Sequence, residues 1–486
     1  MLRRVALRWV LALAGLLFVA AAGAASPTLS LDQIRRLGFA SDDIGYILFD
    51  LRSRAVLAEQ NVDQLFLPAS VTKLATAYAA ARILGPGYRF STLLYRRGND
   101  LYLKGGGDPV LDAVDLDKLA KQLAAAAPQP ASTGGAPLRF FYDDSLMTSL
   151  SAISDRQPVA ASYNTGLSAL AVDFNRIEAD WSQGADGRFS FRALCLADGL
   201  ILPADWISFA PAAADVPAEM PFLYVGKDGA GTPDRWLYSP HLPGRGYAFL
   251  PVKATSLHTA LVFRELAKAA GVQLAMPERG RVPPDAVVVA GTDSPPLPEI
   301  LKGLLRYSNN PSAELVGLAA SRELTGRSLA LAPSAAALAA WLKRQAPRVH
   351  WQGFLLANHS GLAPESRVSP RQMAELLFLA AEDNAVMQAL PSLSGEGIAL
   401  AQGENPRGLI GKSGTMDYAR SLAGYFIARD GRLLGFAIFA FDRAQRAVLD
   451  ARMDPRVLEA TPAARAWVRR ALDLDEVLLR RWMESY

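Results

Sequence analysis

The chain is poor in the residues that most often build cross-links and metal centres. Its 486 residues include one cysteine, Cys195, and four histidines, at positions 241, 258, 350 and 359. A single cysteine excludes an intramolecular disulfide, and no histidine pair has the spacing of a motif such as H-E-x-x-H. We therefore expect no metal and no cofactor. Cys195 lies in the apolar stretch "FRALCLADGL", which favours a buried structural residue over a nucleophile.

The chain also has little net charge and no segment of biased composition. The chain has 51 Lys+Arg and 47 Asp+Glu residues, a formal net charge of +4, and no low-complexity tract. This balance lacks the basic patch that is typical of a nucleic-acid-binding surface. Because the length exceeds what one small core needs, we expect a folded protein of two or three domains.

Long apolar runs are confined to the N-terminus. Three arginines within the first eight residues precede an apolar run over 9–22, and Ala-Gly-Ala at 22–24 ends it. A basic start, a short apolar run and a small-residue exit predict a secretory signal peptide over residues 1–24. An uncleaved membrane anchor is the alternative, although the run is short for a membrane span.

Strand patterns lie at both ends of the remaining chain, with helical patterns between them. Strands are expected at 44–50, at 55–60 and three times within 408–441, where Asp430-Gly431 marks a hairpin. Amphipathic helices are expected over 313–324, 334–346 and 369–383, the last with Ser369 as N-cap. One antiparallel sheet assembled from both ends, with helices packed on it, is an α+β architecture.

The middle and the tail of the chain have a different character. From about residue 88 to 250, short strand-like runs alternate with Gly/Pro turns, which predicts β-rich inserted modules. Residues 260–274 are expected to form a helix followed by a strand. The tail over 462–485 predicts a helix that packs on the body, with membrane-surface attachment as the alternative.

The first candidate for chemistry is Ser70, in "LPASVTKLATAYAA". A helix is expected from about Ser70 to Leu84, with Lys73 one turn on and on the same face. A serine hydroxyl is a weak nucleophile until a base takes its proton. A lysine near its reference pKa of about 10.4 is protonated at neutral pH, so burial or a nearby cation must lower the pKa of Lys73. A surface helix with a polar first turn is the alternative.

A second lysine motif offers that cation. Of ten lysines, only Lys73 has a serine three positions before it, and only Lys412 begins a K-[ST]-G sequence. "GLIGKSGTMD" is expected as a strand beside the nucleophile, where Lys412 lowers the pKa of Lys73 and attracts an anionic substrate. Gly414 lets a substrate backbone approach, and the hydroxyls of Ser413 and Thr415 are placed to bind a terminal carboxylate. An ordinary strand with a solvated lysine is the alternative.

Two S-x-N sequences lie between these motifs, Ser308-Asn309-Asn310 and Ser162-Tyr163-Asn164. Such an element supplies a hydroxyl that passes a proton and an amide that orients the substrate and the lysine. A loop between helices can be held over a helix N-terminus more easily than an inserted module can. We therefore favour Ser308 and Asn310, which precede a helix, over the pair in the β-rich insertion.

The ordered set S-x-x-K, S-x-N and K-[ST]-G resembles the signature of penicillin-binding proteins and serine β-lactamases. The long β-rich interval between Ser70 and Ser308 resembles the low-molecular-mass class C penicillin-binding proteins. These are the peptidase S13 family of D-alanyl-D-alanine carboxypeptidases, of the penicillin-binding protein 4 type. The likeness extends over "LYLKGGGDPVL", "SALAVDFN", "HSGLAPESRVSP" and "KSGTMDYARSLAGYF". Two departures are Ser413 for the commoner Thr and His359 in "NHSGL", where we expect a packing or hydrogen-bonding histidine.

The resemblance implies a transpeptidase-like fold with nested β-rich domains. The catalytic domain would comprise residues 25–90 and 296–486. A second domain, over 91–171 and 252–295, would be inserted in it. A third, over 172–251, would be inserted in the second.

The resemblance also implies a periplasmic serine D-alanyl-D-alanine carboxypeptidase/endopeptidase that cleaves peptidoglycan stem peptides through an acyl-enzyme and that β-lactam antibiotics inhibit covalently. It assigns catalysis to Ser70, Lys73, Ser308, Asn310 and Lys412. Substrate binding falls to Ser413, Gly414 and Thr415, and the backbone N–H groups of Ser70 and Thr415 would form the oxyanion hole. Two alternatives are a serine β-lactamase or esterase of the same fold and a catalytically inactive peptidoglycan-binding protein.

Overall fold

The computed structural model describes residues 26–126, 137–226, 233–393, 408–458 and 460–486. The predicted signal peptide lies outside the described residues. Among the described helices, none has the length and hydropathy needed to cross a bilayer. In the same part of the chain, no cluster of His, Cys, Asp or Glu side chains is arranged to hold a metal ion.

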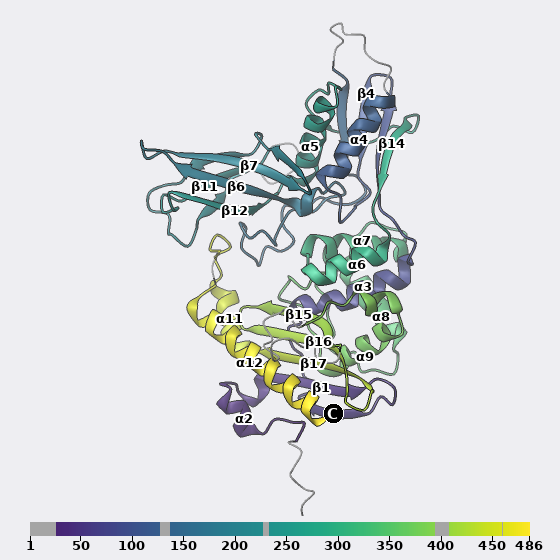
Figure 1. The fold of residues 1–486 in the computed structure, drawn as a ribbon, viewed down its shortest axis with the longest axis vertical. Helices are drawn as coiled ribbons and strands as arrows, with labels where there is room; N and C mark the ends of the chain where they lie inside the picture. The colour runs from purple at the N-terminus through teal and green to yellow at the C-terminus, as the bar shows by residue number, and fades with distance from the viewer. Residues whose placement is uncertain (1–25, 127–136, 227–232, 394–407, 459) are drawn as a thin grey trace, which may run out of the picture.

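A five-stranded antiparallel sheet joins the two ends of the chain (Figure 1). Its order is β15-β16-β17-β1-β2, and β1 pairs with β17 through Ile47 and Ala437. The predicted sheet assembled from both ends is therefore confirmed, and β15 and β2 are its edge strands. The strands are β1 (Ile44–Asp50), β2 (Val56–Gln60), β15 (Ile410–Met416), β16 (Ala419–Ile427) and β17 (Leu433–Phe441).

This sheet is covered on both faces because its strands are apolar on both sides. Ile47 and Phe49 of β1 belong to one core cluster, and Tyr46 and Leu48 to another, as the two-residue repeat of a strand requires. The second cluster includes the C-terminal helix α12 (Pro462–Ser485), which buries Trp467, Leu474, Leu478 and Trp482. The predicted packing of the tail on the body is confirmed.

The opposite face carries a helical layer centred on α3 (Thr72–Leu84). Residues Thr72 to Ala80 of α3 are all buried, and four of these nine are alanines, whose small side chains allow neighbouring helices to approach closely. The helix ends at Gly85, with φ of 81°, a conformation that glycine adopts without strain. The surrounding helices are α6 (Leu297–Tyr307), α7 (Asn310–Thr325), α8 (Leu331–Gln345), α9 (Pro370–Ala381) and α10 (Asn384–Ala389).

The middle of the chain forms the β-rich part drawn above this layer in Figure 1. One sheet has the order β13-β5-β4-β3-β14, and two smaller sheets have the orders β12-β6-β7-β8 and β10-β11-β9. The first sheet packs with α4 (Ala113–Ala126) and α5 (Thr255–Ala269). Its strands are β3 (Ser91–Arg97), β4 (Asp100–Lys104), β5 (Arg139–Asp143), β13 (Glu278–Arg279) and β14 (Val287–Asp293). The smaller sheets contain β6 (Arg176–Gln183), β7 (Phe189–Ala197), β8 (Leu200–Pro203), β9 (Ser208–Pro211), β10 (Phe222–Tyr224), β11 (Arg235–Tyr238) and β12 (Arg245–Pro251).

Two details of the β-rich part bear on the sequence predictions. Cys195 is buried, its Sγ lies 3.6 Å from His258 Nε2, and burial raises the pKa of its thiol, which confirms a structural residue. The prediction of a strand after α5 was wrong, because the segment forms a single isolated bridge, between Leu274 and Leu138. Pro277 follows within three residues and has no N–H to extend the ladder.

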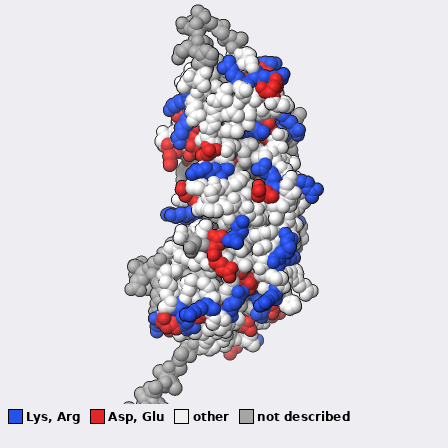
Figure 2. Space-filling view, turned by 90° about the vertical axis from the view of Figure 1, so that its right-hand side faces the viewer, with Lys and Arg blue, Asp and Glu red and all other residues white. Residues whose placement is uncertain are grey.

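The surface carries both signs of charge. Figure 2 shows Lys and Arg side chains mixed with Asp and Glu over the face that it presents, without a large area of one sign. This mixture agrees with the small net charge of +4.

Candidate active site

Ser70 lies in a 3-10 turn, η2 (Ala69–Val71), directly before α3. The residue before it, Ala69, has a positive φ of 44°, a strained conformation that is typical of functional turns. Two glycines lie directly against this turn. A Cβ on Gly361 would meet the Ala69 carbonyl oxygen at 1.9 Å, and a Cβ on Gly414 would meet the Ser70 nitrogen at 2.7 Å. Only glycine fits at either position.

Lys73 is completely buried, with 0% of its surface exposed. Its Nζ lies 3.0 Å from Ser70 Oγ, 2.7 Å from Asn310 Oδ1 and 2.9 Å from the Ser360 carbonyl oxygen. Burial, and next the positive charge of Lys412, hold the pKa of Lys73 well below its usual value. The site therefore favours the neutral amine, which can accept a proton from Ser70.

The sequence Ser308-Asn309-Asn310 joins α6 to α7. Ser308 ends α6 in the left-handed conformation, with φ of 53°, and Asn309 caps α7 by accepting a hydrogen bond from the Ser312 N–H at 2.9 Å. This turn directs Asn310 at Lys73. The Asn310 Nδ2 donates to the Tyr163 carbonyl at 3.1 Å, so the amide is fixed from both sides.

The other S-x-N sequence is placed differently. Asn164 is buried in the β-rich part, where its Oδ1 accepts from the Ser154 N–H at 3.0 Å and its Nδ2 donates to the Ser154 carbonyl at 2.9 Å. Its side chain stabilises a loop and does not meet Lys73. The residue that this segment brings to the site is Tyr163, through its backbone.

The K-S-G sequence lies on the edge strand β15. Lys412 is buried and donates to the Ser413 carbonyl at 2.9 Å. Lys412 and Gly414, two residues apart, share the strand face that meets the Ser70 turn. Ser413 and Thr415 alternate to the other face, where Thr415 Oγ1 accepts from Arg420 Nη1 at 2.8 Å.

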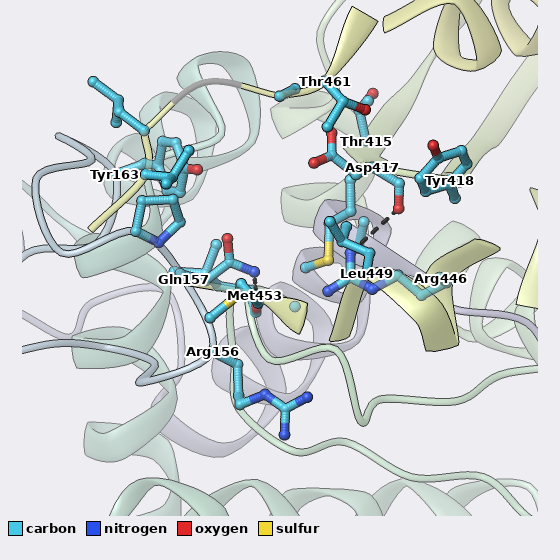
Figure 3. Close-up of a pocket in the computed structure, with 18 of the residues that line it drawn as sticks. Arg156, Gln157, Tyr163, Thr415, Asp417, Tyr418, Arg446, Leu449, Met453 and Thr461 are labelled. Atoms are coloured by element: carbon cyan, nitrogen blue, oxygen red, sulfur yellow. Dashed lines mark hydrogen bonds between the residues drawn. The ribbon is translucent and has the colours of Figure 1, made fainter. Parts of the chain in front are cut away.

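A cavity of about 730 Å³ opens beside Ser70. Ser70, Ser308, Asn310 and Thr415 are among the residues that line it, whereas Lys73, Lys412, Ser413 and Gly414 are not. Figure 3 shows Gln157 and Tyr163 on one side of this cavity and Asp417 and Tyr418 on the other.

A segment between the sheet and the C-terminal helix forms one wall of the cavity. Helix α11 (Arg443–Arg452) and the residues after it contribute Leu449, Met453 and Leu458 to the wall. This segment also reaches the β-rich part: the Val159 N–H donates to the Pro455 carbonyl at 2.7 Å and Arg156 Nη2 donates to the Asp450 carbonyl at 3.3 Å. The cavity is therefore bounded by three distant parts of the chain.

Several residues at the site were not identified from the sequence. Glu314 is fully buried and accepts hydrogen bonds from the N–H groups of His359 and Ser360, each at 3.0 Å. A signal was present, because Glu314 is an acidic residue four positions after Asn310 in an otherwise apolar helix face. Ser360 and Tyr163 act through backbone atoms, for which side-chain identity gives no signal.

His359 lies behind the site and does not line the cavity. Its ring is buried, Nε2 lies 2.7 Å from Ser334 Oγ, and burial lowers its pKa to about 3. The expectation of a packing and hydrogen-bonding histidine is confirmed. The ring fills the space beside Gly317, where a Cβ would meet it at 2.1 Å.

Comparison with known proteins finds relatives along most of the chain. The D-Ala-D-Ala carboxypeptidase 3 (S13) family matches residues 31–195 and 247–461. A D-alanyl-D-alanine carboxypeptidase of an Actinomadura species is 26% identical over 424 residues, which cover 80% of this chain and 76% of that protein. D-alanyl-D-alanine carboxypeptidase DacB of Haemophilus influenzae is 22% identical over 442 residues, which cover 82% and 85%.

Solved structures show the same fold. Penicillin-binding protein 4 from Haemophilus influenzae superposes with a TM-score of 0.72 at 18% identity, over 94% of this chain and 100% of that one. A second structure of that protein, in complex with a β-lactam, gives 0.64 at 20% identity, over 89% and 95%. The transpeptidase-like α+β fold is thereby confirmed. Because the family pattern spans well over half of the sequence on both sides of the β-rich middle, the chain belongs to the D-Ala-D-Ala carboxypeptidase 3 (S13) family.

Proposed function

We propose that the protein is a serine D-alanyl-D-alanine carboxypeptidase/endopeptidase that cleaves peptidoglycan stem peptides through an acyl-enzyme on Ser70. The observation that carries this proposal is the 3.0 Å contact between Ser70 Oγ and the buried Nζ of Lys73. A nucleophile within hydrogen-bond reach of a base that is itself oriented by a third group is the geometry of nucleophilic catalysis. Here Asn310 orients the base.

Acylation begins when Lys73 takes the proton of Ser70 and the serine oxygen attacks the carbonyl of the penultimate D-alanine. The backbone N–H groups of Ser70 and Thr415 stabilise the oxyanion, and one such donor contributes about 3 kcal/mol to transition-state stabilisation. The proximity of Gly414 to the Ser70 nitrogen supports this pairing, since it brings β15 and η2 together. The amide bond breaks, Ser308 relays the proton to the leaving amine, and D-alanine departs.

The remaining motif residues bind the substrate. Lys412 attracts the terminal carboxylate and lowers the pKa of Lys73, while Ser413 and Thr415 offer hydroxyl donors to it. The guanidinium of Arg420 only donates, so its bond to Thr415 Oγ1 leaves the hydroxyl hydrogen of Thr415 available for an acceptor. The edge position of β15 lets an extended peptide align beside it with Gly414 in contact.

Deacylation by water completes the cycle, and a penicillin that acylates Ser70 blocks it. The cavity beside Ser70 has room for a peptide, which supports a stem peptide as substrate. The sheet memberships support the predicted domains, with the catalytic unit in residues 25–90 and 296–486 and the two β-rich units between. The predicted signal peptide supports a periplasmic location, where peptidoglycan lies.

Mass spectrometry of the intact protein after incubation with benzylpenicillin tests the mechanism. We expect one penicillin adduct on the wild type and none on Ser70→Ala. An unmodified wild type, or an adduct that persists in Ser70→Ala, contradicts the proposal. Defined monomeric and cross-linked muropeptides then separate D-alanine release from cross-link cleavage. Rapid turnover of penicillin without D-alanine release indicates a β-lactamase.

A further inference from the structure

Glu314 is a buried carboxylate on the same face of α7 as Asn310, one turn further along the helix. None of its surface is exposed. A buried carboxylate is costly unless its oxygens are hydrogen-bonded. Both oxygens of Glu314 are: Oε1 accepts from the Ser360 N–H and Oε2 from the His359 N–H, each at 3.0 Å.

These two hydrogen bonds hold the backbone segment whose Ser360 carbonyl is one of the three hydrogen-bond partners of Lys73. The Ser360 carbonyl accepts from Lys73 Nζ at 2.9 Å. The next N–H, of Gly361, donates to Asn358 Oδ1 at 3.0 Å, which holds the other end of the same peptide group. Glu314 therefore clamps the turn on the side of Ser360, and Asn358 clamps it on the side of Gly361.

The geometry also indicates the charge of Glu314. Each oxygen faces an N–H donor, and a hydrogen bond with the Ser360 side chain also acts to lower the pKa of Glu314, so these contacts favour the ionised form. The groups that face Lys73 are Ser70 from η2, Asn310 and Glu314 from α7, the Ser360 backbone, and Lys412 from β15. Glu314 is thus a buried anion that acts on Lys73.

We propose that Glu314 is a positioning residue for Lys73, which it orients through the Ser360 carbonyl and whose protonated form it stabilises during acylation. When the proton moves from Ser70 Oγ to Lys73 Nζ, a cation forms beside Lys412 in a buried site. A fixed carboxylate one peptide group away stabilises that cation more than it stabilises the neutral amine. This inference rests on the proposed function, because it assigns Lys73 the role of base.

The charge of Glu314 acts on Lys73 in the direction that the proposal requires. Burial and Lys412 lower the pKa of Lys73, and Glu314 raises it. Burial in turn raises the pKa of Glu314 above its usual value, although its hydrogen bonds and the charge of Lys73 act to lower it. Glu314 therefore limits how far burial and Lys412 lower the pKa of Lys73, which helps the amine to accept a proton.

The test is the pH dependence of the rate at which a fluorescent penicillin acylates the purified protein. For Glu314→Gln we expect the maximal rate to fall about 10- to 100-fold, since general-base catalysis contributes about 10² to 10⁴ in rate and the base is weakened but retained. We also expect the acid limb of the profile to move to lower pH by about one unit, since removal of a nearby anion lowers the pKa of a lysine. The matched control is Glu323→Gln, an exposed glutamate on the same helix, which should leave rate and profile unchanged.

A second variant separates charge from structure. Glu314→Asp keeps the anion but shortens the side chain, so we expect a lower maximal rate with the acid limb near its wild-type position. This variant also serves if Glu314→Gln fails to fold. A folded Glu314→Gln whose acid limb stays within ~0.3 units of the wild type, or a Glu314→Asp whose limb moves as far as one unit, overturns the inference. A wild type that penicillin does not acylate overturns instead the proposed function.

Discussion

Arg420 and Asp475 form a buried ion pair, with Nε of Arg420 2.8 Å from Oδ2 of Asp475. The side chains are 6% and 1% exposed, so neither charge has an alternative partner in bulk water. The pair joins strand β16 to helix α12. Through the bond from Arg420 to Thr415 Oγ1, it also connects the C-terminal helix to the wall of the cavity.

Asp475→Ala should therefore destabilise the protein strongly. Removing one partner of a buried pair leaves an uncompensated charge, and typically costs about 3–5 kcal/mol of unfolding free energy. Glu476→Ala on the same helix is the control, because the exposed pair of Glu476 with Arg480 contributes less than ~1 kcal/mol. Denaturant titration measures both, and equal effects would contradict the structural role of the pair.

Lys73→Arg should abolish acylation while keeping a cation near Ser70. A guanidinium stays protonated at any working pH and accepts no proton, so we expect the acylation rate to fall by about 10² to 10⁴-fold. Lys302→Arg, at an exposed position on α6, controls for the change of residue type. Stopped-flow measurement with a fluorescent penicillin gives the rates. A Lys73→Arg variant with near wild-type acylation would remove Lys73 as the base.

Gly414→Ala should damage the site more than the fold. The new Cβ would lie 2.7 Å from the Ser70 nitrogen and from the Pro68 carbonyl oxygen, so β15 must move away from the turn that carries the nucleophile. Loss of one oxyanion donor costs about 10² to 10³ in rate, and we expect a loss of that order. At Gly303, a half-buried position of α6, a Cβ meets nothing within 4 Å, so Gly303→Ala should be neutral or slightly stabilising. Crystal structures of both variants would show whether β15 moves.

Replacements of Ser308 should separate its hydroxyl from its backbone. Because Ser308 has a φ of 53°, serine and alanine both carry about 1 kcal/mol of backbone strain at this position, whereas Ser308→Gly relieves it. If the hydroxyl relays a proton, both variants lose acylation rate to a similar extent, by about 10² or more, and differ only in melting temperature. A variant of either kind that keeps the wild-type rate would exclude the Ser308 hydroxyl as the relay.

The buried histidines should make stability depend on pH. Burial lowers the pKa of His359 to about 3 and of His258 to about 4. Each histidine is neutral in both states above its unfolded pKa near 6.5. As the pH drops below that value, only the unfolded state takes up the proton, so the free energy of unfolding falls by about 1.4 kcal/mol per pH unit. Asp108 and Asp173, whose pKa burial raises to about 7, act in the opposite sense.

The contribution of one histidine is therefore measured as a difference. We expect the stability advantage of the wild type over His359→Gln to shrink by about 2 kcal/mol between pH 6.5 and pH 5. Thermal unfolding at matched pH values gives this difference. A difference that stays constant with pH would mean that folding does not shift the pKa of His359.

Local patterns in the sequence predicted the elements that carry the motifs. The strand over 44–50 and the capped helix after Ser369 appear as expected, because a short apolar run and an N-cap are local signals. Pairing of β1 with β17 was predictable as well, since strands at both chain ends needed partners. The strand expected near Leu274 was wrong, because Pro277 interrupts the pairing that begins at Leu274.

The part of the site that the sequence did not predict depends on tertiary placement. Backbone carbonyls of Ser360 and Tyr163 contact Lys73 and Asn310, and any residue supplies a carbonyl. The wall formed by α11 and by Arg156 combines segments that are almost 300 residues apart. Such contacts are set by the packing of whole units, for which no local pattern exists.

The hydrogen bond from Asn310 to the Tyr163 carbonyl limits how much of the middle of the chain could be removed. An amide can rotate by half a turn at little cost, and then its nitrogen, not its oxygen, would face the amine of Lys73. The Tyr163 carbonyl, supplied by the middle of the chain, prevents that rotation. A shortened enzyme that joins the two ends of the chain directly would keep every motif residue and lose this anchor. The middle of the chain is therefore a component of the frame that we propose for catalysis, and a lineage that lost it would need another acceptor in the same place.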